Sequence, residues 1–176
     1  MEATPPGTRS PAVVPAFVTG FGLGAFIDGI VLHQVLQWHH LVSSYTPSDD
    51  LAGLEHNTFW DGVFHVAAWL LVLGGLLWLW RRRAATPGLA LGGLVGMLLI
   101  GWGVFNVVDQ LVFHLALGAH HIRMVDNYQV YDWGFTALGV ALAALGWLLL
   151  RRAQAGFEAA SRPAGRGIPH CGCGLG

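Results

Sequence analysis

The 176-residue chain has no lysine and few charged residues of any kind. Charged residues make up only 11% of it, against roughly one-quarter in a soluble domain. Hydrophobic residues make up 54%. The formal net charge of −1 argues against nucleic-acid binding, which needs clustered basic side chains to neutralise phosphates. The composition therefore indicates an integral membrane protein, and we expect a lipid bilayer as its main partner.

Cysteine is also scarce, because Cys171 and Cys173 are the only two. Both fall in the last six residues, so no disulfide framework is expected. A Cys-x-Cys pair beside His170 has the chemistry to hold a soft metal ion. The surrounding stretch is rich in Gly, Ala, Pro and Arg, and we interpret residues 153–176 as a disordered cytoplasmic tail. The proline-rich residues 1–15 contain no signal-peptide pattern and predict a disordered cytoplasmic N-terminus.

Four long apolar segments lie between these ends. Each is near or above the ~20 residues that a helix needs to cross a bilayer. Lipid-facing open strands are excluded because their backbone groups would stay unpaired. The sequence predicts an all-α fold with a four-transmembrane-helix bundle within residues 16–152. The predicted segments are about 17–41, 59–80, 89–117 and 130–150.

The arginines predict the orientation of these helices. Arg81, Arg82 and Arg83 follow the second segment and Arg151 follows the fourth, whereas only Arg123 lies in a loop of the opposite side. The positive-inside rule then places both termini in the cytoplasm. Loops 42–58 and 118–129 face outward. We expect a multi-pass protein of a bacterial plasma membrane.

An internal repeat is the most informative pattern. The motif G-x-G-x5-D-x4-H-x5-H-H begins at Gly20 and again at Gly101, displaced by 81 positions without a gap. The second helix of each half matches more weakly, with Asp61 approximately parallel to Asp132. The sequence therefore predicts two parallel helical-hairpin repeats, about 16–81 and 89–152, related by a pseudo-two-fold axis along the membrane normal.

Helical geometry predicts the depth of the repeated polar residues. We expect one group at the outer interface, namely His39, His40, His120, His121, Asp61 and Asp132. At 1.5 Å per residue, His33 and His114 would lie about 10 Å deeper. Asp28 and Asp109 would lie about 18 Å below the histidine pairs, near mid-membrane. A charge there costs roughly 2.5–3.5 kcal/mol, so a proton, a histidine or a metal ion should neutralise it.

The α-helical period also predicts which of these side chains share a face. His33 and His40 would form one stripe, as would His114 and His121, with Asp28 and His39 on another. Asp61 and His65 are four residues apart on the second helix. This spacing suits a metal-binding pair or a carboxylate that orients an imidazole.

Three hypotheses explain the Asp/His constellation. The first is a transition-metal site open to the outer face, for Cu, Zn or Fe, in a protein that handles metal or performs redox chemistry. Its expected ligands are His33, His114, Asp28, Asp109, Asp61 and His65, with His39, His40, His120, His121 and Asp132 near its mouth. The second is a b-type haem electron carrier with His33 and His114 as axial ligands. The third is an ion or proton-coupled carrier.

Metal handling or redox chemistry would suit respiratory-chain or metal-handling membrane proteins as partners. The residues alone do not decide between an enzyme and a carrier. They contain no GxSxG elbow, P-loop or HExxH motif.

The runs GFGLGAFIDGIVLHQVLQWHH, NTFWDGVFHVAAW and NVVDQLVFHLALGAHHIR carry a family resemblance. Together they resemble a family of bacterial four-helix integral membrane proteins of unknown function, over roughly Pro15 to Arg152. The resemblance implies a four-helix membrane topology. It implies no activity, so the functional hypotheses rest on the residues themselves.

Overall fold

The computed structural model describes residues 11–85 and 91–161, and every regular element in this part of the chain is helical. Four helical stretches are long and apolar enough to cross a membrane, which confirms the predicted all-α, four-span fold. The elements are α1 (Val13–Asp28), η1 (Gly29–Val35), α2 (Leu51–Arg82), η2 (Arg83–Ala85), α3 (Leu91–Asp109), η3 (Gln110–Ala116) and α4 (Tyr128–Ser161).

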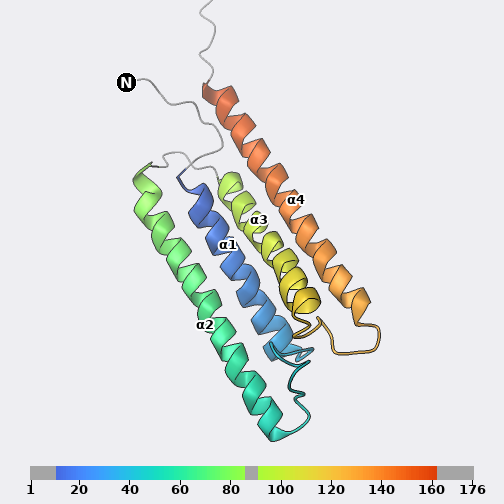
Figure 1. Ribbon diagram of the computed structural model, residues 1–176. Helices are drawn as coiled ribbons and strands as arrows, with labels where there is room; N and C mark the ends of the chain where they lie inside the picture. The colour runs from blue at the N-terminus through green and yellow to red at the C-terminus, as the bar shows by residue number, and fades with distance from the viewer. Residues whose placement is uncertain (1–10, 86–90, 162–176) are drawn as a thin grey trace, which may run out of the picture.

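The helices lie side by side in the order α2, α1, α3, α4 (Figure 1). The helix α1 packs against both α2 and α3, and α3 packs in turn against α4. Among the described residues, α2 and α4 do not contact each other, so the bundle is an open row. The central pair is accordingly the most buried, and most residues of the outer pair are exposed. The two loops 36–50 and 117–127 lie at the same end of the row (Figure 1).

Two glycines allow α1 and α3 to approach closely. A Cβ atom on Gly20 would lie 2.1 Å from the backbone oxygen of Leu98. A Cβ atom on Gly101 would lie 2.2 Å from the backbone oxygen of Phe17. No side chain fits at either distance, and small residues at a helix crossing are a usual feature of membrane proteins. This contact brings the two motif-bearing helices together along the centre of the molecule.

The first helix ends earlier than predicted, whereas the third ends within one residue of the predicted 117. Both change to π-helix after their aspartate, in η1 and η3, and stop at Val35 and Ala116. A residue in the left-handed region then turns the chain, Gln37 at φ 49° and Gly118 at φ 59°. The predicted helix to residue 41 is therefore too long, and His39 lies in a non-helical segment.

The outer helices are longer than predicted. The helix α2 begins at Leu51, where the Asp50 side chain accepts a hydrogen bond of 2.7 Å from the Gly53 backbone N–H. Such a cap satisfies a free donor at a helix start. The helix α4 continues to Ser161, so the predicted disorder from residue 153 is wrong for 153–161. The rest of the predicted tail, with His170 and both cysteines, lies outside the described residues.

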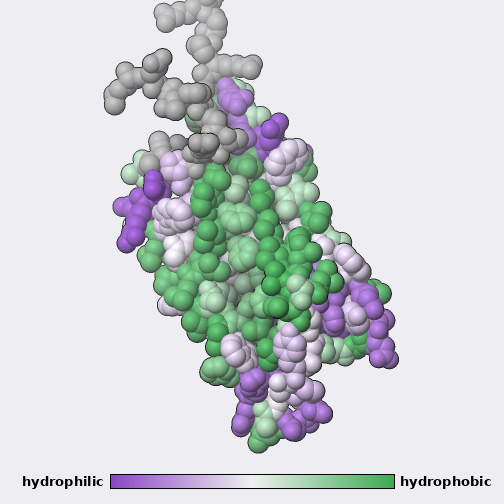
Figure 2. All heavy atoms as spheres, viewed as in Figure 1, coloured by the Kyte–Doolittle hydropathy of each residue, from purple (hydrophilic) through white to green (hydrophobic). Residues whose placement is uncertain are grey.

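The surface has the polarity that a membrane requires. A broad hydrophobic band covers the middle of the helices, and hydrophilic residues gather toward the two ends (Figure 2). Large apolar side chains such as Phe59, Trp69 and Trp133 are more than half exposed on α2 and α4. In water such exposure would be costly, and lipid contact removes the cost. The protein is therefore suited to a bilayer.

Candidate metal centre

The two loops after the short helices fold back into the protein and interlock. The Ser44 N–H donates to the Ala119 carbonyl, and the Met124 N–H donates to the Trp38 carbonyl at 3.3 Å. The Tyr45 hydroxyl donates to the Leu117 carbonyl. These contacts join the two loops at one end of the molecule. Among the described residues, both histidine–aspartate groups beside the loops are buried, so the predicted open site is not seen there.

The same folding carries His39 and His120 into the interior, where they are only 2% and 1% exposed. The sequence predicts both at the outer interface, far above the aspartates. This prediction is wrong because it continues an α-helix through residue 41, whereas the helix ends at Val35. The left-handed residue before each pair reverses the chain, and one histidine of each pair then points inward.

Four imidazole rings meet in the core. The rings of His39 and His120 stack with centroids 4.5 Å apart. The ring of His33 lies edge-on to His39 at 4.5 Å, and that of His114 lies edge-on to His120 at 4.7 Å. Two histidines from each half thus form one continuous cluster, as the predicted convergence of both hairpins required.

Asp61 fixes the first half of this cluster from α2. Its carboxylate accepts hydrogen bonds from the Nδ1 atoms of His33 at 2.8 Å and His40 at 2.7 Å. It also accepts one from the Leu41 backbone N–H at 2.9 Å. A carboxylate that holds Nδ1 fixes the ring and leaves Nε2 free to bind a metal ion.

Asp132 performs the same task from α4. Its carboxylate accepts from the Nδ1 atoms of His114 at 3.0 Å and His121 at 2.8 Å, and from the Ile122 backbone N–H at 2.9 Å. The weak sequence match between Asp61 and Asp132 thus corresponds to equivalent hydrogen bonds.

Asp28 and Asp109, the last residues of α1 and α3, lie next to the outer histidines of the cluster. Asp28 lies 3.4 Å from the Nε2 atom of His33, and Asp109 lies 3.1 Å from that of His114. In each case the two residues are five apart, which an α-helix would place about 140° round its axis at ~100° per residue. The π-helix brings residues five apart onto one face. The predicted stripe of Asp28 with His39 therefore does not exist, although the fold brings both into the same cluster.

Hydrogen-bond partners identify the tautomer of the two innermost rings. The Nδ1 atom of His39 lies 2.9 Å from the Ile122 carbonyl, and that of His120 lies 3.0 Å from the Leu41 carbonyl. A carbonyl only accepts, so each Nδ1 carries the hydrogen. Burial lowers the pKa of His120 to about 4 and the pKa of His39 well below its ordinary value. Both rings are neutral at pH 7, and each Nε2 presents a lone pair.

Several buried polar atoms of the cluster have no hydrogen-bond partner. They are the Nε2 atoms of His33, His39, His114 and His120, together with Asp28 Oδ1 and Asp109 Oδ2. The His33–Asp28 and His114–Asp109 separations are short, but neither is a hydrogen bond, so proximity alone does not satisfy these atoms. A buried acceptor without a partner is costly. These atoms need a proton or a cation.

In this arrangement two groups of three side chains lie close enough together to bind a metal ion. The first triad is Asp28, His33 and His39, and the second triad is Asp109, His114 and His120. Within each triad the potential ligand atoms lie within 4.8 Å of one another, and all six residues are buried. Imidazole with carboxylate suits Zn, Cu(II), Fe and Mn. Either triad can therefore hold a metal.

A third group, His114, His121 and Asp132, has similar spacing. Its atoms are already bonded to one another, because both Nδ1 atoms donate to the Asp132 carboxylate. We assign this group, and the matching His40–Asp61 pair, to holding the rings of the core histidines. His40 and His121 thus lie in contact with the aspartates and not in the triads.

His65 is a predicted ligand that belongs to neither triad. Its Nδ1 atom bonds to the backbone oxygen of Asp61 at 2.8 Å and not to the carboxylate, and its ring lies against Phe26. The predicted Asp61–His65 metal pair is therefore not formed. Sequence reasoning also missed the carbonyls of Leu41 and Ile122 that fix the innermost rings. No sequence pattern marks a backbone oxygen for this task.

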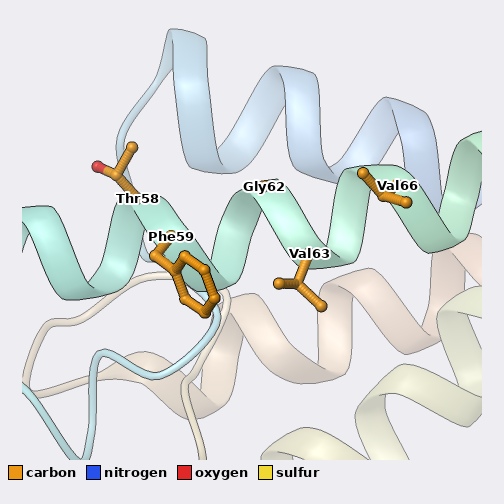
Figure 3. A pocket seen from close by; sticks show the side chains of 5 residues that line it. All are labelled: Thr58, Phe59, Gly62, Val63 and Val66. Atoms are coloured by element: carbon orange, nitrogen blue, oxygen red, sulfur yellow. The ribbon is translucent and has the colours of Figure 1, made fainter.

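A shallow hollow on α2 lies apart from this centre. Its five lining residues all belong to α2 (Figure 3): Thr58, Phe59, Gly62, Val63 and Val66. Its lining is apolar apart from one hydroxyl, and Phe59, Gly62, Val63 and Val66 are exposed. It has the character of a lipid contact and carries none of the ligand residues.

Comparison with known proteins agrees with this structure. No curated protein and no solved structure matches the chain. A family described as a predicted membrane protein, DUF2243, matches residues 15–153. The match covers most of the first and fourth spans, the second and third spans, and both triads. The chain therefore belongs to the DUF2243 family of predicted membrane proteins.

Proposed function

We propose that this protein binds a transition metal inside the membrane, at the cluster formed by the two triads, and serves in metal handling or redox chemistry. The observation that carries the proposal is the set of four inward Nε2 atoms without a hydrogen-bond partner. Their opposite ring nitrogens are all held, by Asp61, Asp132 and two carbonyls. Metal-binding histidines in proteins are held in this way.

The cost of ionisable groups inside a membrane favours a resident ion. Ionisable groups inside a membrane are expensive and are kept where they have a function. Here two carboxylates and four imidazoles share one buried space, and the polar atoms that face it lack partners. A metal ion satisfies lone pairs and charges together.

The packing favours a metal ion over a haem. Axial ligation by His33 and His114 requires a flat macrocycle between their rings. In the core, His39 packs against His33 and His120 packs against His114, and the two inner rings stack on each other. A porphyrin would have to displace both inner rings and break their bonds to the Ile122 and Leu41 carbonyls. A metal ion needs no such displacement.

A carrier is less well supported than a fixed metal centre. Movement of an ion through the protein needs a path to at least one face. The two loops are joined beside the cluster, both triads are buried, and α1 and α3 pack closely at Gly20 and Gly101. We therefore propose a resident metal, with transport as the alternative that vesicle uptake assays would reveal.

We infer the location from the arginines and the spans together. Arg81, Arg82 and Arg83 lie at the end of the row opposite to loops 36–50 and 117–127. By the positive-inside rule that end faces the cytoplasm. The metal centre then belongs to the outer half of a bacterial plasma membrane, with both termini in the cytoplasm.

Elemental analysis of the protein, purified in detergent without chelator, tests the proposal. We expect a first-row transition metal bound in stoichiometric amount, with no Soret band in the visible spectrum. The His33→Ala/His114→Ala variant should lose the metal, whereas His56→Ala should keep it, because His56 is exposed on α2 and its ring lies against Trp60, away from the triads. A metal-free native protein, or a Soret band that His33→Ala abolishes, would refute the proposal.

A further inference from the structure

We propose that the centre is dinuclear, with one divalent ion in the first triad and a second in the second triad. This inference rests on the proposed function, because it assumes that the cluster binds metal at all. It adds the number of ions, their ligands and the kind of coordination. Three independent observations support it.

The first observation is the separation of the ligand sets. Each triad contains its own carboxylate and its own two imidazoles, and no residue belongs to both. Donors to one tetrahedral ion at about 2.1 Å lie roughly 3.4 Å apart, so small side-chain rotations close each triad around an ion. The stacked rings of His39 and His120 belong to different triads and form the boundary between them.

The second observation is the distribution of the carboxylates. Four buried carboxylates lie against the outer rings of the cluster: Asp28 and Asp61 at His33, and Asp109 and Asp132 at His114. Each half therefore has its own pair of carboxylates around its own histidine. An ion in one triad lies against only one of these pairs. Carboxylates are costly inside a bilayer, so a cation beside each pair is favoured.

The third observation is that the histidines of both halves are held by equivalent hydrogen bonds. His33 and His114 are each held by an aspartate of the following helix, at 2.8 and 3.0 Å. His39 and His120 are each held by a carbonyl, at 2.9 and 3.0 Å. A site for a single ion would need only one such pair of hydrogen-bonded histidines. Here each triad has its own pair.

The donor set also indicates the coordination chemistry. Two histidines and one carboxylate supply three protein ligands and leave positions open on each ion, which is typical of non-haem Fe(II) sites and of catalytic rather than structural metal sites. No thiolate or thioether belongs to either triad, which disfavours Cu(I). We therefore expect hard or borderline divalent ions with exchangeable ligands at the open positions.

The experiment measures stoichiometry with Zn²⁺ as the probe. Native protein is stripped with chelator, equilibrated with Zn²⁺, separated from free ion and analysed. We expect two ions per chain. Asp28→Asn/His33→Asn should keep one ion, Asp109→Asn/His114→Asn should keep one, and the fourfold variant should bind none. His56→Ala is the control and should bind two.

The outcomes separate this inference from the proposed function. No ion in the native protein refutes both. One ion in the native protein, or loss of both ions when either triad is changed, refutes only the dinuclear assignment and indicates a shared site. Variants are compared only when they remain monodisperse and helical.

A second measurement needs no variant. Native protein loaded with Cu²⁺ should give an electron paramagnetic resonance spectrum with a half-field transition. Each ion would lie beside one of the two stacked rings, His39 and His120, whose centroids are 4.5 Å apart, so the two spins should couple. An uncoupled spectrum of isolated ions at full loading would overturn the inference.

Discussion

The imidazole rings of His39 and His120 stack almost parallel, with planes 4° apart and centroids 4.5 Å apart. Each ring is anchored across the interface, because His39 donates to the Ile122 carbonyl and His120 to the Leu41 carbonyl. Each loop thus supplies a histidine to its own triad and holds the histidine of the other triad. The arrangement links the two triads through their innermost members.

Removal of the Asp61 carboxylate should weaken metal binding without removing a ligand. Asp61→Asn keeps the size of the side chain but loses the charge that holds His33 and His40. Loss of such an orienting partner typically costs about 10–100-fold in metal affinity. Competition with a chelator of known affinity measures the change. Asp49→Asn, on the exposed loop, is the matched control and should leave affinity unchanged.

Bound metal should also stabilise the fold. An ion that binds only the folded protein adds about 2.7 kcal/mol when its free concentration is 100 times Kd. We expect the midpoint of thermal unfolding in detergent to fall after treatment with chelator and to rise again with added Zn²⁺. A midpoint that does not respond to Zn²⁺ in the native protein would contradict a metal site in the core.

Close packing of α1 on α3 should make Gly101 intolerant of a side chain. The Cβ atom of Gly101→Ala would lie 2.2 Å from the backbone oxygen of Phe17, so a helix must move. Overpacking of this kind costs typically about 1–3 kcal/mol. Unfolding by denaturant in mixed micelles measures the loss. Gly62→Ala, where nothing lies within 4 Å, should be neutral or slightly stabilising.

The two left-handed residues should respond in opposite ways to substitution. A Cβ atom on Gly118, at φ 59°, would meet nothing within 4 Å, so Gly118→Ala tests backbone strain alone. Left-handed conformation costs a residue with a side chain roughly 1–2 kcal/mol. Gly118→Ala should therefore lower the free energy of unfolding by about 1 kcal/mol. Gln37→Gly should raise it by a similar amount, since the exposed Gln37 carries that strain at φ 49°. Equal effects of the same sign would contradict this account.

The inferred orientation is tested by thiol labelling. In a Cys171→Ser/Cys173→Ser background, Ser48→Cys places a single thiol in loop 36–50. A membrane-impermeant maleimide should label it in intact cells. In the native protein, Cys171 and Cys173 should react only after the membrane is permeabilised. The reverse pattern would invert the topology and place the metal centre toward the cytoplasm.

The sequence predicts the helices and the convergence of the polar residues. It does not predict the backbone conformation that brings these residues together. Long apolar runs identify membrane helices because lipid tolerates little else. The repeated Asp–His motif also identified all six triad residues as candidates. The positions of His39 and His120 could not be predicted, because an α-helical period was assumed where the chain forms π-helix and then reverses at Gln37 and Gly118.

The weak match of Asp61 with Asp132 proved informative, whereas the spacing of Asp61 and His65 did not. Spacing of four residues places two side chains on one helix face, but it does not decide which partner a carboxylate selects. Asp61 bonds to two histidines and a backbone N–H from another segment, and these outcompete a neighbour on its own helix. Contacts of this kind depend on the loop conformation and are absent from any local pattern.

The crossed anchoring of His39 and His120 has a consequence for biogenesis. A lone hairpin, freshly inserted, has all three members of its triad but lacks the carbonyl that fixes the inner one. The ring of His39 would lack its hydrogen bond to the Ile122 carbonyl until the second hairpin packs against the first. Loading with metal should thus wait for completion of the whole chain, which protects a nascent protein from capturing ions prematurely.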